Sequence, residues 1–125
     1  MKNKKLSERC RQVESFLSDF KNLLDVSGLP IKHRKKNEDL IFRLGLTQKN
    51  CLDILYSLSP ENYYKGPAPD DLHGGNYWEF GIEIERELIY IKIKIVTDDY
   101  GNEWPVCYSF HGPEFEMSFA LRGRT

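Results

Sequence analysis

The stretch YWEFGIEIERELIYIKIKIV, residues 77–96, decides the fold, because apolar and polar side chains alternate along it with a period of two. Such alternation is typical of β-strands that have one buried and one open face. It predicts a first strand at 77–85 and a second at 88–96, joined by a two-residue turn at Arg86-Glu87. The same period returns from Val106 to His111 and predicts a third strand.

Upstream of this stretch the apolar residues recur at spacings of three and four, which is the period of amphipathic helices. The first such segment predicts a helix from Leu6 to Val26 with Ser7 as its N-cap. Further start signals predict two helices and a short helical turn, namely Glu38 to Leu44 after Asn37, Gln48 to Leu58 after Thr47, and Asn62 to Lys65 after Ser59-Pro60.

These elements predict one α+β domain that spans residues 1–125. Its amino-terminal helices, within about residues 6–65, pack on one face of a three-stranded or slightly larger antiparallel sheet at about residues 77–111. The Pro-, Asp- and Gly-rich segment 66–76 is expected to be a loop.

Composition narrows the class of protein. The formal net charge is −1 and the pI about 6.3, so only local basic runs such as Lys32–Lys36 can attract nucleic acid. No apolar stretch approaches the roughly 20 residues of a membrane helix, so we expect a cytoplasmic protein that does not bind membranes. The three cysteines are widely spaced, which favours small core residues over disulfides or a zinc site, and we expect no metal or other cofactor.

Because the apolar faces of the strands all seek the helices, their polar faces share one open surface. Its members carry acidic, basic or phenolic groups and are Glu79, Tyr90, Lys92, Lys94 and His111. With the turn at Arg86-Glu87, Glu79 is expected opposite Lys94 and diagonal to Lys92. His111 is expected opposite Tyr90 or Lys92.

This set suits cleavage of RNA by its own 2′-hydroxyl, which needs a base, an acid and cations but no metal. Glu79 is predicted to be the base and His111 the acid, since histidine titrates near neutrality. Lys92 and Lys65 are expected to face the phosphate, and Lys94, on the same surface, is also expected to bind substrate. Unpaired bases are expected to stack on the tyrosines Tyr63, Tyr64 and Tyr77.

Each group also has a structural interpretation. Glu79 can be a surface cross-strand ion-pair partner, Lys92 and Lys94 can be ordinary solvated strand residues, and Lys65 can complement a helix dipole. A histidine before Gly112-Pro113 can be structural, while His33 and His73 lie in predicted loops and the Lys32–Lys36 run can be a solvated connector.

Four motifs, taken together, resemble the MqsR family of type II toxins. The segment Leu58-Ser59-Pro60-Glu61-Asn62-Tyr63-Tyr64-Lys65 is similar to the family's L-S-x-x-D-F-Y-K. The others are Trp78-Glu79 at the start of a strand, Ile89-Tyr90-Ile91-Lys92-Ile93 against V-Y-L-K-I, and Tyr108-Ser109-Phe110-His111 against V-S-F-K-E. The similarity extends over about residues 40–114.

The resemblance implies a RelE-like fold, mRNA cleavage and inhibition by a cognate antitoxin, with the ribosome as a further possible partner. By position, it implies catalytic roles for Lys65, Glu79, Tyr90 and His111. Glu79 stands where the family has glutamine and His111 where it has lysine, and both are better proton carriers than the residues they replace. The rival hypothesis is a non-catalytic α+β module that binds RNA or protein on the same sheet.

Overall fold

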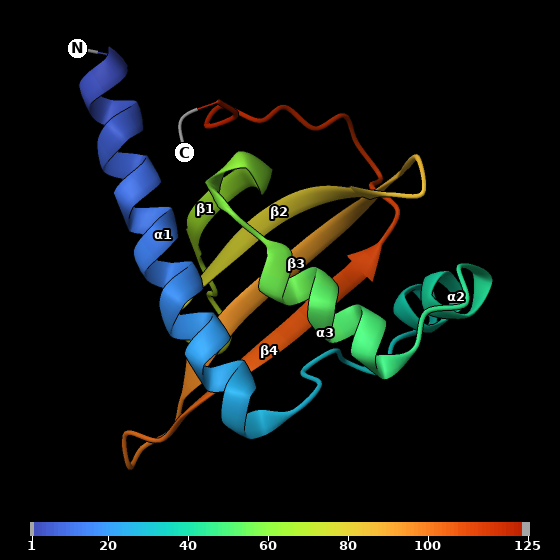
Figure 1. Ribbon diagram of the computed structural model, residues 1–125. Helices are drawn as coiled ribbons and strands as arrows, with labels where there is room; N and C mark the ends of the chain where they lie inside the picture. The colour runs from blue at the N-terminus through green and yellow to red at the C-terminus, as the bar shows by residue number, and fades with distance from the viewer. Residues whose placement is uncertain (1, 124–125) are drawn as a thin grey trace.

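Four antiparallel strands form one sheet in the order β1-β2-β3-β4, which is also their order along the chain (Figure 1). The computed structural model describes residues 2–123. The strands are β1 (Tyr63–Pro69), β2 (Asn76–Ile84), β3 (Glu87–Thr97) and β4 (Glu103–His111). The α+β class and the antiparallel sheet predicted from the sequence are therefore confirmed.

Three helices precede the sheet, namely α1 (Lys2–Ser27), α2 (Lys35–Arg43) and α3 (Gln48–Ser57), and a 3-10 turn η1 (Pro60–Asn62) follows them. Helices α1 and α3 cover one face of the sheet, while α2 lies beside β4 (Figure 1). The buried residues of α1 follow one stripe, as its period requires, and are Cys10, Val13, Leu17, Phe20 and Leu24. They meet the apolar sides of the strands, where Phe80, Ile91 and Phe110 are fully buried.

The predicted helix starts are right in two cases and wrong in two. Thr47 caps α3 through a reciprocal pair of hydrogen bonds with Asn50, and Ser59 caps η1, as expected. Helix α1 begins at Lys2, so Ser7 lies inside it. Asn37 lies inside α2, whose N-cap is Arg34, and the buried Asn37 side chain bonds to the backbone of β4 and of Lys32 instead of to its own helix.

The segment expected to be a helical turn and a loop contains an edge strand, β1. Gly66, Pro67 and Pro69 look like a loop in sequence. Proline is tolerated at a sheet edge because its missing N–H faces away from the neighbouring strand, and β1 pairs with β2 across two register shifts. Residues 63–69 therefore belong to the sheet and not to the helical part.

The β2–β3 hairpin turns at Glu85-Arg86, one residue earlier than predicted, with both residues at positive φ. Glu87 therefore belongs to β3, where its carboxylate accepts two hydrogen bonds from Arg43 at the end of α2. The shift keeps every side chain on its predicted face but changes its partner. Glu79 lies opposite Lys92, so the expectation that it faces Lys94 is wrong.

A bulge in β4 explains a second difference. Lys92 pairs with Ser109 and Ile93 pairs with Cys107, which leaves Tyr108 as the extra residue. Cys107, which strict alternation back from His111 would put on the open face, is therefore buried among the core residues, as Cys10 and Cys51 also are and as expected of the three cysteines. Burial raises the pKa of the Cys107 thiol, as expected of a core cysteine.

After β4 the chain returns across the sheet toward α1 (Figure 1), and we call residues 112–123 the C-terminal strap. The strap crosses the open face at Gly81, where an added Cβ would lie 2.7 Å from the Phe119 ring. Only glycine leaves room for this crossing. Beyond it, Leu121 is fully buried in the core.

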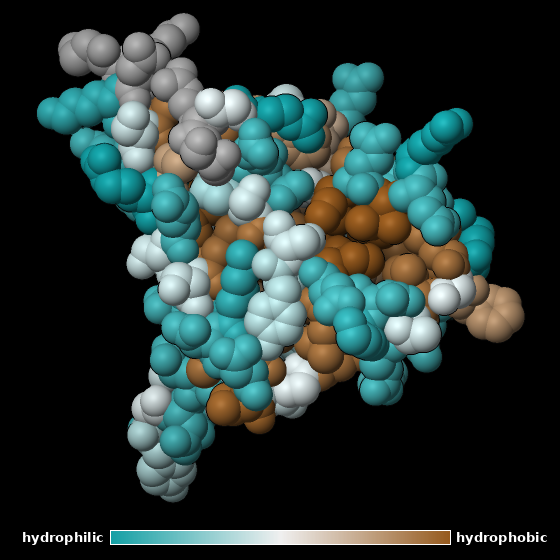
Figure 2. Space-filling model, viewed as in Figure 1, coloured by the Kyte–Doolittle hydropathy of each residue, from teal (hydrophilic) through white to brown (hydrophobic). Residues whose placement is uncertain are grey.

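On the helix-covered side, apolar side chains remain visible between hydrophilic ones (Figure 2). A shallow hollow of about 360 Å³ lies there, lined in part by Leu44, Leu46, Ile54 and Ile84. None of the helices within residues 2–123 combines the length and the apolar character needed to cross a bilayer.

Candidate functional site

Two rows of side chains cross the open face of the sheet. Lys65 of β1, Glu79 of β2, Lys92 of β3 and Ser109 of β4 are successive register partners and form the first row. The second row lies two residues further along each strand and consists of Gly81, Tyr90 and His111. The predicted base, acid, phenol and two of the lysines therefore share one surface, and His111 lies opposite Tyr90, which is one of the two positions expected for it.

Tyr90 holds the Glu79 carboxylate. Its hydroxyl donates a hydrogen bond of 2.5 Å to Oε1 of Glu79. Burial, followed by the adjacent carboxylate of Glu79, raises the pKa of the Tyr90 hydroxyl well above its usual range. Tyr90 thus stays protonated and acts as a donor. Because its side chain is only 7% exposed, it orients Glu79 rather than presenting itself to a substrate.

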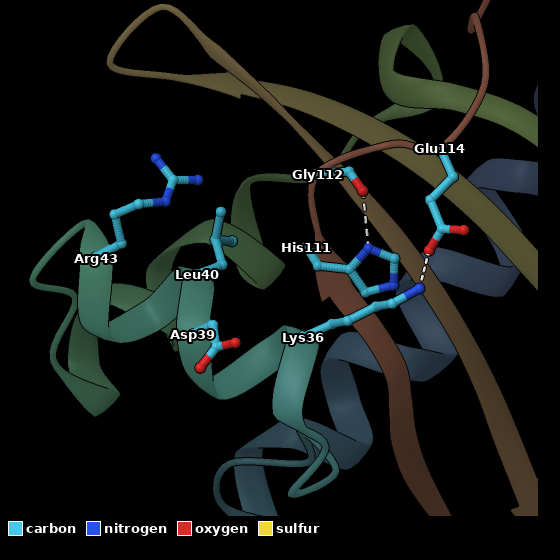
Figure 3. A pocket seen from close by; sticks show the side chains of 7 residues that line it. All are labelled: Lys36, Asp39, Leu40, Arg43, His111, Gly112 and Glu114. Atoms are coloured by element: carbon cyan, nitrogen blue, oxygen red, sulfur yellow. Dashed lines mark hydrogen bonds and ion pairs between the residues drawn. The ribbon is translucent and has the colours of Figure 1, made fainter.

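His111 is half-buried, with its ring centroid 5.7 Å from that of Tyr90. Its Nδ1 lies 2.8 Å from the carbonyl oxygen of Gly112 (Figure 3). A carbonyl oxygen only accepts, so this contact assigns a proton to Nδ1 and leaves Nε2 as the atom that can exchange a proton with a ligand. The strand end thereby fixes which nitrogen of the imidazole is chemically active.

The two lysines of the first row are held by aromatic rings and keep their charges accessible. The Lys92 ammonium lies 4.1 Å from the centroid of the Tyr77 ring, and Lys92 is half-buried. The exposed Lys65 places its ammonium 5.1 Å from the centroid of the Tyr64 ring. Within residues 2–123 neither lysine forms an ion pair with Glu79, so the interpretation of Glu79 as a surface ion-pair partner finds no support there.

Lys94, predicted to bind substrate, lies outside this set. It is 2% exposed, and its ammonium donates to Oδ2 of Asp70 at 2.7 Å and to the carbonyl oxygen of Gly74. Hydrogen bonds with Lys94 lower the pKa of the Asp70 carboxyl far below its usual range. The loop at residues 70–75 folds over this lysine, so Lys94 organises the loop and has no surface left for a substrate.

The predicted stacking tyrosines are already engaged with other rings. Tyr64 stacks on Phe115 of the strap at 5.6 Å between ring centroids, and Tyr77 meets Tyr108 edge-on at 5.3 Å. Burial, then the hydrogen bond with Asp70, raises the pKa of Tyr77 to about 12. Tyr63, also named as a stacking residue, is buried under the helices with its hydroxyl bonded to Gly66.

A cleft of about 450 Å³ opens from the second row toward α2. We call it the α2–β4 cleft. The residues that line it come from α2, β3, β4 and the strap, and they are Arg34, Lys35, Lys36, Asn37, Tyr90, Lys92, Ser109, His111, Glu114 and Phe115. Among them are four lysine or arginine side chains and one carboxylate, in a chain with a net charge of −1. The part of the surface next to His111 is therefore locally basic.

Asn37 fixes the position of the basic segment. Its side-chain nitrogen donates to the carbonyl oxygens of Lys32 and Tyr108, and its Oδ1 accepts from the N–H of Phe110 at 2.8 Å. The guanidinium of Arg34 also donates to the carbonyl of Tyr108. Sequence reasoning identified the basic run but could not place it beside His111, because this placement depends on contacts between residues more than 70 positions apart.

A second hollow of about 370 Å³ shares Lys36, His111 and Glu114 with the α2–β4 cleft, and its lining is drawn in Figure 3. Lys36 and Glu114 form an ion pair between α2 and the strap. The hydrogen bond with Lys36 lowers the pKa of Glu114, which stays an anion near neutral pH. His111 thus lines two hollows, and both are also bordered by the exposed ion pair of Lys36 and Glu114.

Searches of family models, of curated proteins and of solved structures find no match to this chain. Membership of the MqsR family stays a prediction that rests on the four motifs quoted above. Among the described residues, no group of three or more histidine, cysteine, aspartate or glutamate side chains is arranged to hold a metal ion.

Proposed function

We propose that the protein is an endoribonuclease that cleaves single-stranded RNA by attack of the 2′-hydroxyl, with Glu79 and His111 as the proton-transfer pair. One observation carries this proposal. A carboxylate with a fixed orientation, an imidazole with one free nitrogen and the ammonium of Lys92 face the same open surface, beside a basic cleft.

In the proposed reaction the Glu79 carboxylate takes the proton of the 2′-hydroxyl, and the 2′-oxygen forms a bond to phosphorus. The bond between phosphorus and the 5′-oxygen of the next nucleotide breaks. The imidazolium of His111 gives its Nε2 proton to that oxygen. The products are a 2′,3′-cyclic phosphate and a 5′-hydroxyl, so atoms and charges balance without an added reactant.

The remaining residues of the site orient the Glu79 carboxylate or stabilise the charge on the phosphate. Tyr90 positions the Glu79 carboxylate through its hydroxyl, which leaves Oε2 of Glu79 to act on the substrate. Lys92, next to Glu79 in the first row, stabilises the negative charge that develops on the phosphate oxygens, and Lys65 does so from β1. The His111 ring, on the far side of Tyr90 from β2, serves the leaving group.

The motifs that resemble the MqsR family extend the proposal. We take the natural substrate to be mRNA, the protein to be the toxin of a type II toxin-antitoxin system with a RelE-like fold, and the site of action to be the cytoplasm. A cognate antitoxin is then the expected protein partner, and the ribosome a further one. Expression without a partner should arrest growth, and His111→Ala should relieve that arrest.

The direct test is cleavage of a labelled single-stranded RNA by purified protein in EDTA. The wild-type protein should leave 2′,3′-cyclic phosphate ends, while Glu79→Gln and His111→Ala should each slow cleavage by about 100-fold or more. Glu83→Gln is the matched control, since Glu83 is an exposed residue of the same strand. Binding of RNA that stays intact would refute the nuclease and support the rival RNA-binding module.

A further inference from the structure

The proposed base, the cation, the proposed acid and the basic cleft follow one another across the sheet from β2 toward β4 and beyond it. Glu79 stands on β2, Tyr90 and Lys92 on β3, His111 on β4, and the basic residues of the α2–β4 cleft beyond β4. Neighbouring strands are about 4.8 Å apart, so these groups succeed one another at spacings smaller than a nucleotide. A bound strand of RNA that meets them in turn has its chemical polarity fixed by which of them is the base.

The proposed chemistry sets that polarity. The 2′-hydroxyl belongs to the nucleotide on the 5′ side of the scissile phosphate, and the leaving oxygen to the nucleotide on the 3′ side. With Glu79 as base and His111 as acid, the 5′ nucleotide lies toward β2 and the 3′ nucleotide toward β4. The next phosphate on the 3′ side then reaches the α2–β4 cleft.

We propose that the α2–β4 cleft binds the RNA phosphates on the 3′ side of the scissile bond, with Arg34 and Lys36 as the cations that hold them. This inference rests on the proposed function and deepens it by assigning a direction to the substrate.

Three observations support this assignment. The cleft is continuous with the reacting groups, since Tyr90, Lys92 and His111 line it together with Arg34 and Lys36. The basic segment is held in place, because Asn37 and Arg34 are both bonded to the backbone of β4. Lys36 already binds an oxyanion there, the carboxylate of Glu114. This ion pair and His111 line the same hollow (Figure 3).

The other side of the site differs. Toward β1 the open face carries the exposed Lys65, and the strap covers Gly81 with Phe119 and Met117. Of five cavities compared over residues 2–123, the α2–β4 cleft is lined by four lysine or arginine side chains and each of the other four by at most two. Phosphate binding should therefore be stronger on the 3′ side of the cut than on the 5′ side.

The test uses oligonucleotides in which all nucleotides but one are 2′-deoxy, so that only one bond can be cut. Sets with each of the four bases at the ribose are lengthened by one to three nucleotides on the 3′ side or on the 5′ side. For the wild-type protein the KM should fall by about tenfold as the 3′ side grows, because charge-assisted phosphate contacts are added. Growth on the 5′ side should lower the KM much less.

Arg34→Gln and Lys36→Gln should each remove most of the gain from 3′ extension and leave the gain from 5′ extension as it is. Each should also reduce the salt dependence of binding, as the slope of log K against log salt, by about 0.7. Arg34→Lys keeps the charge and should keep much of the gain. Lys49→Gln, which removes an exposed ion-paired lysine on α3, is the matched control and should keep the whole gain.

If the Arg34 and Lys36 variants instead lost the fall in KM that comes with 5′ extension, the RNA strand would be bound in the opposite direction, and the inference would be wrong. An equal gain from both sides in wild type and variants would also overturn it, while cleavage itself would still support the proposed nuclease. Absence of cleavage of any oligonucleotide by the wild-type protein would refute the nuclease and this inference together.

Discussion

Lys92 and Lys94 leave the same face of β3 two residues apart, yet they belong to different environments. The region around Lys92 is a cleft with an imidazole and further cations. The region around Lys94 is closed by the loop 70–75, and a Cβ on Gly75 would lie 3.2 Å from its Cε atom. Strand position alone does not decide whether a lysine meets a substrate, because the covering loop does.

The largest expected effect is the loss of stability in Lys94→Ala, which leaves the Asp70 carboxylate buried without its cation. Breaking a buried pair costs far more than breaking an exposed one. Lys94→Ala should lose on the order of 3 kcal/mol of the free energy of unfolding, measured by urea denaturation. Lys92→Ala should lose less than about 1 kcal/mol. Equal losses would erase the contrast between the two lysines.

Lys92→Gln should lower the rate of RNA cleavage by about tenfold or more, because one cation beside the reacting phosphate is removed. The fold should persist, as circular dichroism can verify. The charge-conserving Lys92→Arg should recover part of the rate. A folded Lys94→Met protein that lost as much activity as Lys92→Gln would show that both lysines act on the substrate.

Acid should weaken the Lys94 region specifically. Because the pKa of Asp70 is depressed in the folded protein, its contribution to stability is complete above its unfolded pKa of about 4. Below that pH the unfolded chain takes up a proton that the native carboxylate does not, so stability falls. The loss of stability from pH 5 to pH 2 should be smaller in Asp70→Asn than in wild type, by denaturation at each pH. Parallel curves would contradict this role of Asp70.

The smallest effect is expected at the mouth of the cleft. Glu114→Gln frees the Lys36 ammonium, and exposed ion pairs contribute little, so the affinity for a single-stranded all-deoxy oligonucleotide, which offers the same phosphates, should rise by only about two- to threefold. Fluorescence anisotropy with an all-deoxy oligonucleotide measures this without cleavage. Glu116→Gln, an exposed strap carboxylate, serves as the control. A lower affinity in Glu114→Gln would mean that the ion pair builds the cleft instead of competing for it.

In β2 and β3 the strand faces were predictable from the sequence, and the strand partners were not. Period two places Glu79, Tyr90 and His111 on one surface wherever the hairpin turns, since a shift by two residues preserves faces. The partner of Glu79 depends on whether the turn is at Glu85-Arg86 or one residue later. That choice involves Glu87 and its contact with Arg43 of α2, which local sequence does not encode.

The other differences between the predicted and the observed structure involve residues that are common in two kinds of local structure. Asn37 has the sequence context of a helix cap, but its amide is used by β4, and Pro67 and Pro69 resemble a loop but form an edge strand. The α2–β4 cleft could not be derived, because it arises only when α2, β4 and the strap meet. Lys94 could be excluded as a substrate contact only after its partner Asp70 was located across the loop.

The carboxamide of Asn37 has a consequence for assembly. A strand at the end of a sheet exposes unpaired N–H and C=O groups, which invite a strand from another molecule. Along β4 these groups are occupied, at Cys107 by the backbone of Pro30 and Lys32 and at Tyr108 and Phe110 by Asn37. A foreign strand would have to displace these bonds before it could extend the sheet at β4, so Asn37 shields this edge against pairing with another molecule.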